Sequence, residues 1–150
     1  MVVKRIHVCA YPPQGNVQAN HWVAFLELDG QVSVKVDMTP GSDGSTGVAM
    51  FSYRTYRSTM QAVVDLVYET RNNPTVQTIL NLVTEKRLDK YRFNADGEGC
   101  RLWIYKFIKS LEDAGYLDAG TAGTVWNYLS YFWRSSTDRV AKAIAQGAFY

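Results

Sequence analysis

The sequence predicts an α+β domain in which an antiparallel sheet packs against a central helix that begins at Cys100. Two apolar runs, residues 21–28 and 31–38, flank Asp29-Gly30, a pair typical of a tight β-hairpin turn. From residue 100 to 111, apolar side chains recur three and four positions apart, the spacing of a helix with one buried face. The hairpin predicts the sheet, and the periodic run predicts the helix that covers it.

The other elements follow from local patterns of apolar, β-branched and turn-forming residues. Residues 60–69 fit either a strand or a helix, and their β-branched run favours a strand. Gly115 should end the central helix, and Pro74 should open an earlier one. The remaining predicted segments are a strand over 2–9, a loop over 11–16, a turn over 40–45, a strand over 48–56, and helices over 74–88, 100–114, 121–133 and 138–146.

The hairpin turn decides which side chains share a face of the sheet. Asp29-Gly30 is typical of a two-residue type I′ turn, which would place His21 opposite Met38. In that register His21 points towards apolar neighbours, and Asp37 falls on the other face. A β-bulge would be needed to bring the two side chains together.

Length and charge limit the classes of function. The chain has 150 residues, 47% of them hydrophobic and 20% charged, which fits a single domain over residues 1–150. A net charge of +2 is too small for binding nucleic acid through its phosphates. No segment approaches the roughly 18 apolar residues of a membrane span, and the first residues do not form a signal-peptide core. We therefore expect a cytoplasmic protein that binds no nucleic acid and does not span a membrane.

Cys100 is the candidate nucleophile. A cysteine in the first turn of a helix lies beside unpaired N–H groups, which lower a thiol pKa and can stabilise an oxyanion. His21, one of only two histidines, is the better placed base, while His7 with Cys9 forms a rival pair that lacks a helix dipole. A cysteine on an apolar helix face is also a common core residue. No Cys and His spacing resembles a metal site, and we expect no cofactor.

A base of this kind is usually oriented by a third polar residue. Asp37 is the nearest carboxylate on the hairpin, with Asn20 and Gln18 as alternatives. Aromatic and polar residues near the candidate catalytic positions are expected to form the walls of a cleft. The expected substrate-binding residues are Asn20, Trp22, Tyr91, Arg101 and Trp103.

The order of these parts resembles the circularly permuted papain-like superfamily. A histidine-bearing strand, a hairpin and meander, and then a cysteine at the start of a packed helix occur over about residues 20–115. The superfamily includes relatives of lecithin:retinol acyltransferase and permuted NlpC/P60-like peptidases, in which the histidine precedes the cysteine. The resemblance implies Cys100 as nucleophile and His21 as base in acyl transfer or amide or thioester hydrolysis of a small molecule or peptide.

Four short motifs are spread over most of the chain. They are Asn20-His21-Trp22, Val36-Asp37-Met38 with Pro40-Gly41, Tyr91-Arg92-Phe93, and Gly97-Glu98-Gly99-Cys100-Arg101 with Trp103. Together they resemble an uncharacterised family of small fungal proteins that is known as a domain of unknown function. This resemblance implies no activity, but it groups His21, Asp37 and Cys100 as marked positions.

Two other functions fit the same residues. A non-catalytic module could use the cleft to bind a small molecule or a partner chain, and its affinity would survive Cys100→Ser. A natural-product tailoring enzyme could use acid–base residues of the cleft without covalent catalysis, and would depend on His21 or Asp37 but not on Cys100. The crowded aromatic residues of the run 126–133 could form a pocket wall or a contact in a homodimer, but core packing is the commoner use for most such residues.

Overall fold

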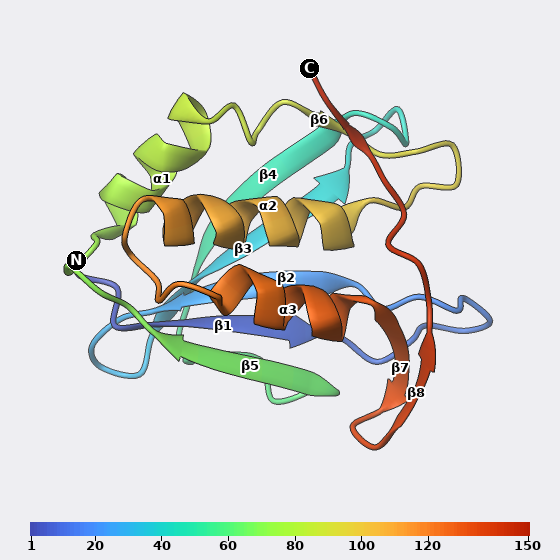
Figure 1. Cartoon of the computed structure of the whole chain (residues 1–150), viewed down its shortest axis with the longest axis horizontal. Coiled ribbons are helices and arrows are strands. Elements are labelled where there is room, and N and C mark those ends of the chain that lie inside the picture. The colour runs from blue at the N-terminus through green and yellow to red at the C-terminus, as the bar shows by residue number, and fades with distance from the viewer.

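The computed structural model, which describes all 150 residues, confirms the α+β class. The strands of the main sheet are β1 (Arg5–Ala10), β2 (Trp22–Glu27), β3 (Ser33–Pro40), β4 (Gly47–Arg54) and β5 (Val64–Glu69). They pair antiparallel in the order β4-β3-β2-β1-β5. Figure 1 shows the helices on one side of this sheet. The favoured strand assignment for residues 60–69 is thus confirmed over β5.

Three helices and two small strand pairs complete the chain. None of the helices has the length and apolar character needed to cross a membrane. The helix expected from Pro74 begins two residues later, after Thr75, whose hydroxyl accepts a hydrogen bond from the backbone N–H of Thr78 at 3.0 Å. The elements are α1 (Val76–Glu85), β6 (Tyr91–Arg92), α2 (Cys100–Asp113), α3 (Thr121–Leu129), β7 (Tyr131–Ser135), β8 (Asp138–Ala141) and β9 (Ala148–Phe149).

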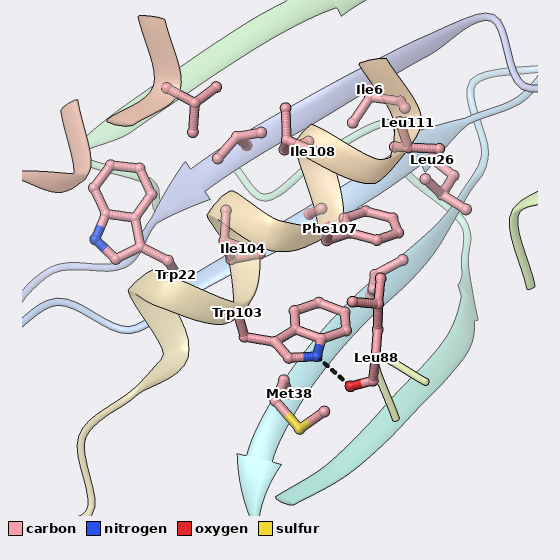
Figure 2. Packing of buried hydrophobic residues seen from close by; sticks show 14 of the residues in the cluster. Ile6, Trp22, Leu26, Met38, Leu88, Trp103, Ile104, Phe107, Ile108 and Leu111 are labelled. Carbon is pink, nitrogen blue, oxygen red and sulfur yellow. Dashed lines mark hydrogen bonds between the residues drawn. The ribbon is translucent and has the colours of Figure 1, made fainter. Parts of the chain in front are cut away.

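Helix α2 is the central packing element, as its apolar spacing predicts. Its buried face, which includes Trp103 and Phe107, lies against side chains of β1, β2 and β3 (Figure 2). The indole N–H of Trp103 donates a hydrogen bond to the carbonyl of Leu88 at 2.7 Å, so this buried polar group is satisfied. Each large apolar side chain buried in this way contributes about 1.5–3 kcal/mol, and this packing fixes the position of the first turn of α2.

The loop between β2 and β3 has three residues, 29–31, and the predicted two-residue type I′ turn is wrong. The N–H of Leu28 donates to the carbonyl of Val32 at 2.9 Å and closes the loop. Gly30 and Gln31 both have positive φ, 80° and 61°. A left-handed residue at the end of a short turn is the usual way to build a three-residue hairpin loop.

The extra loop residue shifts the pairing of the two strands by one position. Ala24 lies opposite Val36, whereas a two-residue turn would pair it with Lys35. Because side chains alternate along a strand, this shift moves every side chain of β3 to the other face of the sheet. The expectation that His21 and Asp37 lie on opposite faces is therefore wrong, and no β-bulge is needed to bring them together.

The outer face of the sheet is covered by the connection between β4 and β5, residues 55–63. These strands lie at opposite edges, so their connection must cross the sheet. The hydroxyl of Ser33 donates to the carbonyl of Tyr56 at 2.6 Å, and the ring of Tyr56 packs on Phe25 with centroids 6.0 Å apart. Beneath this connection, Cys9 is fully buried.

The C-terminal region differs most from the prediction. The helix expected over 121–133 ends at Leu129, because Tyr131, Phe132 and Trp133 continue as the strand β7. The helix expected over 138–146 is wrong, since residues 138–141 form β8 and pair with β7. Consecutive aromatic residues favour a strand that can pack on both faces. The rest of the tail runs to β9, which pairs with β6.

The left-handed conformation of Gln31 predicts that glycine is better at this position. A side chain with a Cβ adds conformational strain of about 1 kcal/mol to the folded state there. Glycine removes this strain, and the larger conformational entropy that it gives the unfolded chain offsets only part of the gain. We expect Gln31→Gly to raise the free energy of unfolding by about 0.5 kcal/mol in urea denaturation. Gln31→Ala keeps the backbone strain and should not stabilise. Equal effects of the two substitutions would contradict the three-residue loop.

Candidate active site

Cys100 is the first residue of α2, at an end of the helix that no side chain caps. The first N–H groups of a helix have no acceptor within it, and they carry the positive end of the helix dipole. No acidic residue lies in the first turn to neutralise that end. The thiol is partly exposed, and its sulfur lies 3.9 Å from the carbonyl oxygen of Asn20. This contact places Cys100 beside the start of β2.

His21 is held by Asp37 across the hairpin. The imidazole Nε2 lies 2.7 Å from Oδ1 of Asp37, and both side chains are partly buried. His21 precedes β2, and its carbonyl accepts the N–H of Tyr11 at 2.9 Å, which ties its backbone to the residue that follows β1. With Nε2 bound to the carboxylate, Nδ1 is the ring nitrogen that remains free to exchange a proton with another group.

The thiol of Cys100 is the second partner of the His21 side chain. Burial alone would lower the pKa of His21, but hydrogen bonds to Asp37 and Cys100 outweigh it and raise this pKa to about 9. Burial likewise opposes the charged form of Asp37, whose pKa is nevertheless lowered by the hydrogen bond from His21 and the charge of Lys35. The predicted nucleophile, base and orienting carboxylate thus lie near one another, in the order Cys100, His21, Asp37, with a direct hydrogen bond between His21 and Asp37.

A cavity of about 600 Å³ opens beside this group of residues. One wall is the segment 11–21, and the other is the segment 96–101 with the start of α2. Figure 1 shows the loop before α2 and the loop after β1 on the same side of the molecule. Cys100 and His21 both line the cavity, so a molecule bound there would reach the thiol.

Three of the expected substrate-binding residues do not line this cavity. Trp22, Tyr91 and Trp103 are fully buried in the core, so they cannot form its walls. Tyr91 supports the site from behind, because its hydroxyl donates to the carbonyl of Gly99 at 2.7 Å. A sequence pattern marks an aromatic residue as apolar but does not show whether it faces a core or a cleft.

The other two expected binding residues, Asn20 and Arg101, line the cavity but direct their polar groups into the protein. The amide of Asn20 donates to the carbonyl of Trp133 and accepts from its N–H, both at 2.7 Å. The guanidinium of Arg101 donates to three backbone carbonyls, those of Leu129, Lys142 and Ala143, at 2.7–2.9 Å. Both residues therefore fix the walls of the cleft.

Several residues of the site were not singled out by the sequence. Lys35 lies two positions before Asp37, so the two side chains share a face of β3. This spacing was the sequence signal that could have linked Lys35 to the site. Lys142 bridges the two walls, with Nζ 2.5 Å from the carbonyl of Gln18 and 3.0 Å from a carboxylate oxygen of Glu98. No local pattern connects Lys142 with loops that precede it by more than forty residues.

The rival pair of His7 and Cys9 lies on the outer face, away from the cleft. His7 is held between two carboxylates, with Nε2 2.8 Å from Glu27 and Nδ1 3.1 Å from Asp65. Burial and the nearby Asp65 charge raise the pKa of the Cys9 thiol, and its sulfur is fully buried. Cys9 is therefore protonated and shielded, and no group of histidine, cysteine and carboxylate side chains in the structure is arranged to hold a metal ion.

A protein-family model described as a domain of unknown function, DUF7770, matches residues 6–150, and the chain therefore belongs to this family. The expected membership of an uncharacterised family is confirmed at this level. No curated protein and no solved structure is significantly similar to the chain. The family description assigns no activity.

Gly99 should be required for the position of Cys100. Its φ is 151°, and an added Cβ would lie 2.8 Å from the hydroxyl oxygen of Tyr91. Gly97 has a positive φ of 72° but no neighbour within 4 Å, so it is a matched control. We expect Gly97→Ala to cost about 1 kcal/mol and Gly99→Ala about 1–3 kcal/mol more in urea denaturation. Equal costs would show that the contact with Tyr91 does not constrain Gly99.

The pair of His21 and Asp37 should make stability depend on pH. The pKa of His21 is raised from its ordinary 6.5 to about 9, so the folded state holds this proton more tightly than the unfolded state. The resulting stabilisation is fully present below about pH 6.5 and is lost as pH rises through 9. We expect the free energy of unfolding to decline over this window more steeply in the wild type than in His21→Asn. His7, whose pKa is also raised, contributes to both proteins, and parallel pH profiles would contradict the assignment.

Proposed function

We propose that this member of the DUF7770 family is a cysteine-dependent enzyme that transfers or hydrolyses an acyl group. Cys100 is the nucleophile, His21 moves the proton, and Asp37 orients His21. The observation that supports this best is that Cys100 and His21 line one cleft while Asp37 binds His21 from outside it. The thiol lies at an uncapped helix N-terminus and shares the cleft with an imidazole whose Nε2 is bound by a carboxylate at 2.7 Å.

The first half of the proposed reaction forms an acyl-enzyme. His21 takes the proton of the Cys100 thiol, and the sulfur attacks the carbonyl carbon of an amide, ester or thioester. A carbon–sulfur bond forms while the carbonyl π pair moves to oxygen. When the carbonyl re-forms, the bond to the leaving group breaks and His21 gives its proton to that group. Asp37 keeps the imidazole oriented throughout.

The second half releases the acyl group. Water, or an acceptor alcohol or amine, attacks the thioester carbon through its oxygen or nitrogen. As it attacks, it gives a proton to neutral His21. The carbon–sulfur bond then breaks, and the proton held by His21 returns to the sulfur. Atoms and charge balance without an oxidant, a metal or a cofactor.

The start of α2 supplies the electrostatic part of this proposal. A developing oxyanion needs N–H donors that are already oriented, and the first turn of α2 presents such groups beside the Cys100 sulfur. The tight approach of Gly99 to Tyr91 and the burial of Trp103 hold this turn in place. Removing one such donor in other enzymes costs about a hundredfold or more in rate.

The size and position of the cleft support a small-molecule or peptide substrate. A volume of about 600 Å³ is within the usual range for a small ligand. The catalytic thiol must stay reduced, and both cysteines are free, so we place the protein in the cytoplasm. The order of histidine before cysteine, with the cysteine helix packed on an antiparallel sheet, supports a relationship to permuted papain-like enzymes.

Alkylation of the thiols tests the proposed nucleophile without a known substrate. We expect iodoacetamide to label Cys100 at pH 6.5 and not Cys9, which is fully buried, as mass spectrometry of the native protein would show. His21→Ala should slow labelling of Cys100 by about tenfold or more, because the thiolate loses the nearby imidazolium that stabilises it. Asp37→Asn should slow it less. Asp29→Asn, on the same hairpin but 85% exposed in its side chain, is the matched control and should have no effect.

The same variants separate the other functions. Labelling of Cys100 that is slow and independent of His21 would rule out the covalent mechanism. A small-molecule affinity that survives both Cys100→Ser and His21→Ala would instead support a binding module. Turnover of a substrate by Cys100→Ser that is lost in His21→Ala would support acid–base catalysis without an acyl-enzyme.

A further inference from the structure

We infer that Lys35 is a positioning residue whose ammonium group balances the charge of Asp37 and so keeps the proton on His21 exchangeable. This inference rests on the proposed function, in which His21 must both accept and release a proton. It assigns a part in the reaction to a residue that does not line the cleft and would not touch the substrate.

Lys35 and His21 bind the two oxygens of the same carboxylate. Nζ of Lys35 lies 3.4 Å from Oδ2 of Asp37, while Oδ1 of Asp37 lies 2.7 Å from Nε2 of His21. Each carboxylate oxygen of Asp37 thus faces a cation when His21 is protonated. The Lys35 side chain is only 17% exposed, so solvent screens this interaction far less than a surface ion pair.

Tyr11 closes the arrangement on the other side. The Lys35 ammonium lies 5.3 Å from the centroid of the Tyr11 ring, a cation–π contact. The same ring lies nearly parallel to the imidazole of His21, with an interplanar angle of 7° and centroids 6.3 Å apart. Four side chains from the end of β1, the start of β2 and the strand β3 therefore form a closed ring, Tyr11, His21, Asp37, Lys35. The Lys35 ammonium is thus placed by two contacts, one with the Asp37 carboxylate and one with the Tyr11 ring.

The charge of Lys35 opposes the effect of Asp37 on His21. Asp37 stabilises the imidazolium, and Cys100 does so when it is ionised. Lys35 is the cation in direct contact with Asp37, and it weakens this stabilisation. The other charged residues at the cleft are Asp96, Glu98 and Arg101, on the loop before α2 and in its first turn, and Lys142, which pairs with Glu98. Release of the acyl group needs neutral imidazole, so a cation at this position favours the second half-reaction.

The direction of the effect separates charge balance from a purely structural role. If Lys35 only held Asp37 in place, its removal would loosen the carboxylate, and His21 would lose its proton at lower pH. If Lys35 balances charge, its removal leaves Asp37 unopposed, and His21 keeps its proton to higher pH. Lys35→Met preserves most of the aliphatic stem, while Lys35→Arg preserves the charge.

The test is an NMR titration of the carbon-bound ring protons of histidine in the wild type, Lys35→Met and Lys35→Arg. The chain has two histidines, and the signal that disappears in His21→Asn identifies His21. We expect Lys35→Met to move the midpoint of His21 upward, by on the order of half a pH unit. Lys35→Arg should stay near the wild-type midpoint. Lys109→Met, which removes a lysine paired with Asp113 on α2 away from the cleft, is the control.

An unchanged or lowered midpoint in Lys35→Met would overturn the inference. The titration does not depend on catalysis, so it separates this inference from the proposed function. Reactive, His21-dependent Cys100 together with an unchanged midpoint would leave the nucleophile standing and remove the role of Lys35. An upward shift together with an inert Cys100 would show that Lys35 balances Asp37 but takes no part in acyl transfer. Where turnover is observed, Lys35→Met should lower the rate of acyl-enzyme breakdown at pH 7 more than that of its formation.

Discussion

The candidate site depends on one residue in the loop of the β2–β3 hairpin. Gln31 adopts a left-handed conformation and lengthens the loop from two residues to three. Since a shift of one residue exchanges the faces of a strand, this loop puts Asp37 and Lys35 on the same face as His21. With the shorter loop, the carboxylate would point into the apolar core, and its burial without a partner would be strongly unfavourable.

The candidate site also requires that the N-terminus of α2 be held in place. Residues on the side of this turn away from the cleft, Tyr91 above all, hold it. The hydroxyl of Tyr91 accepts the N–H of Gly147 and donates to the carbonyl of Gly99. A Cβ on Gly147 would clash with the same oxygen, and the tail approaches Tyr91 even more closely than Gly99 does. Arg101 adds bonds to the carbonyls of Lys142 and Ala143. The C-terminal tail is therefore part of the support of Cys100, although it lies outside the main sheet.

The sequence was sufficient where a local pattern is repeated over several residues. The apolar spacing after Cys100 predicted both the helix and its buried face, and Gly115 marked its end with a positive φ of 83°. The grouping of Cys100 with His21 followed from the helix start and the scarcity of histidine. The face of the sheet on which Asp37 lies could not be predicted from the sequence. The pair Asp29-Gly30 fits a two-residue loop as well as a three-residue loop, and only the packing of the strands decides between the two registers.

The tail was mispredicted for a related reason. Residues 138–146 have a composition that a helix tolerates, but Lys142 and Ala143 offer their carbonyls to Arg101 instead. A helix would use those carbonyls internally. The buried guanidinium needs acceptors, and this long-range demand outweighs a weak local preference. Aromatic residues such as Trp22 show the same limit, since their burial depends on which face of the sheet the helices cover.

The two histidines show why similar contacts lead to different chemistry. His7 has a carboxylate at each ring nitrogen, and although burial opposes the charged form, the hydrogen bonds to Asp65 and Glu27 raise its pKa. His21 has one carboxylate, and its second partner is the thiol of Cys100. The first arrangement holds a proton and ties strands together on the outer face. The arrangement at His21 leaves Nδ1 for proton exchange at the mouth of the cleft. It forms because Asp37 lies on the face of the sheet from which its carboxylate reaches His21.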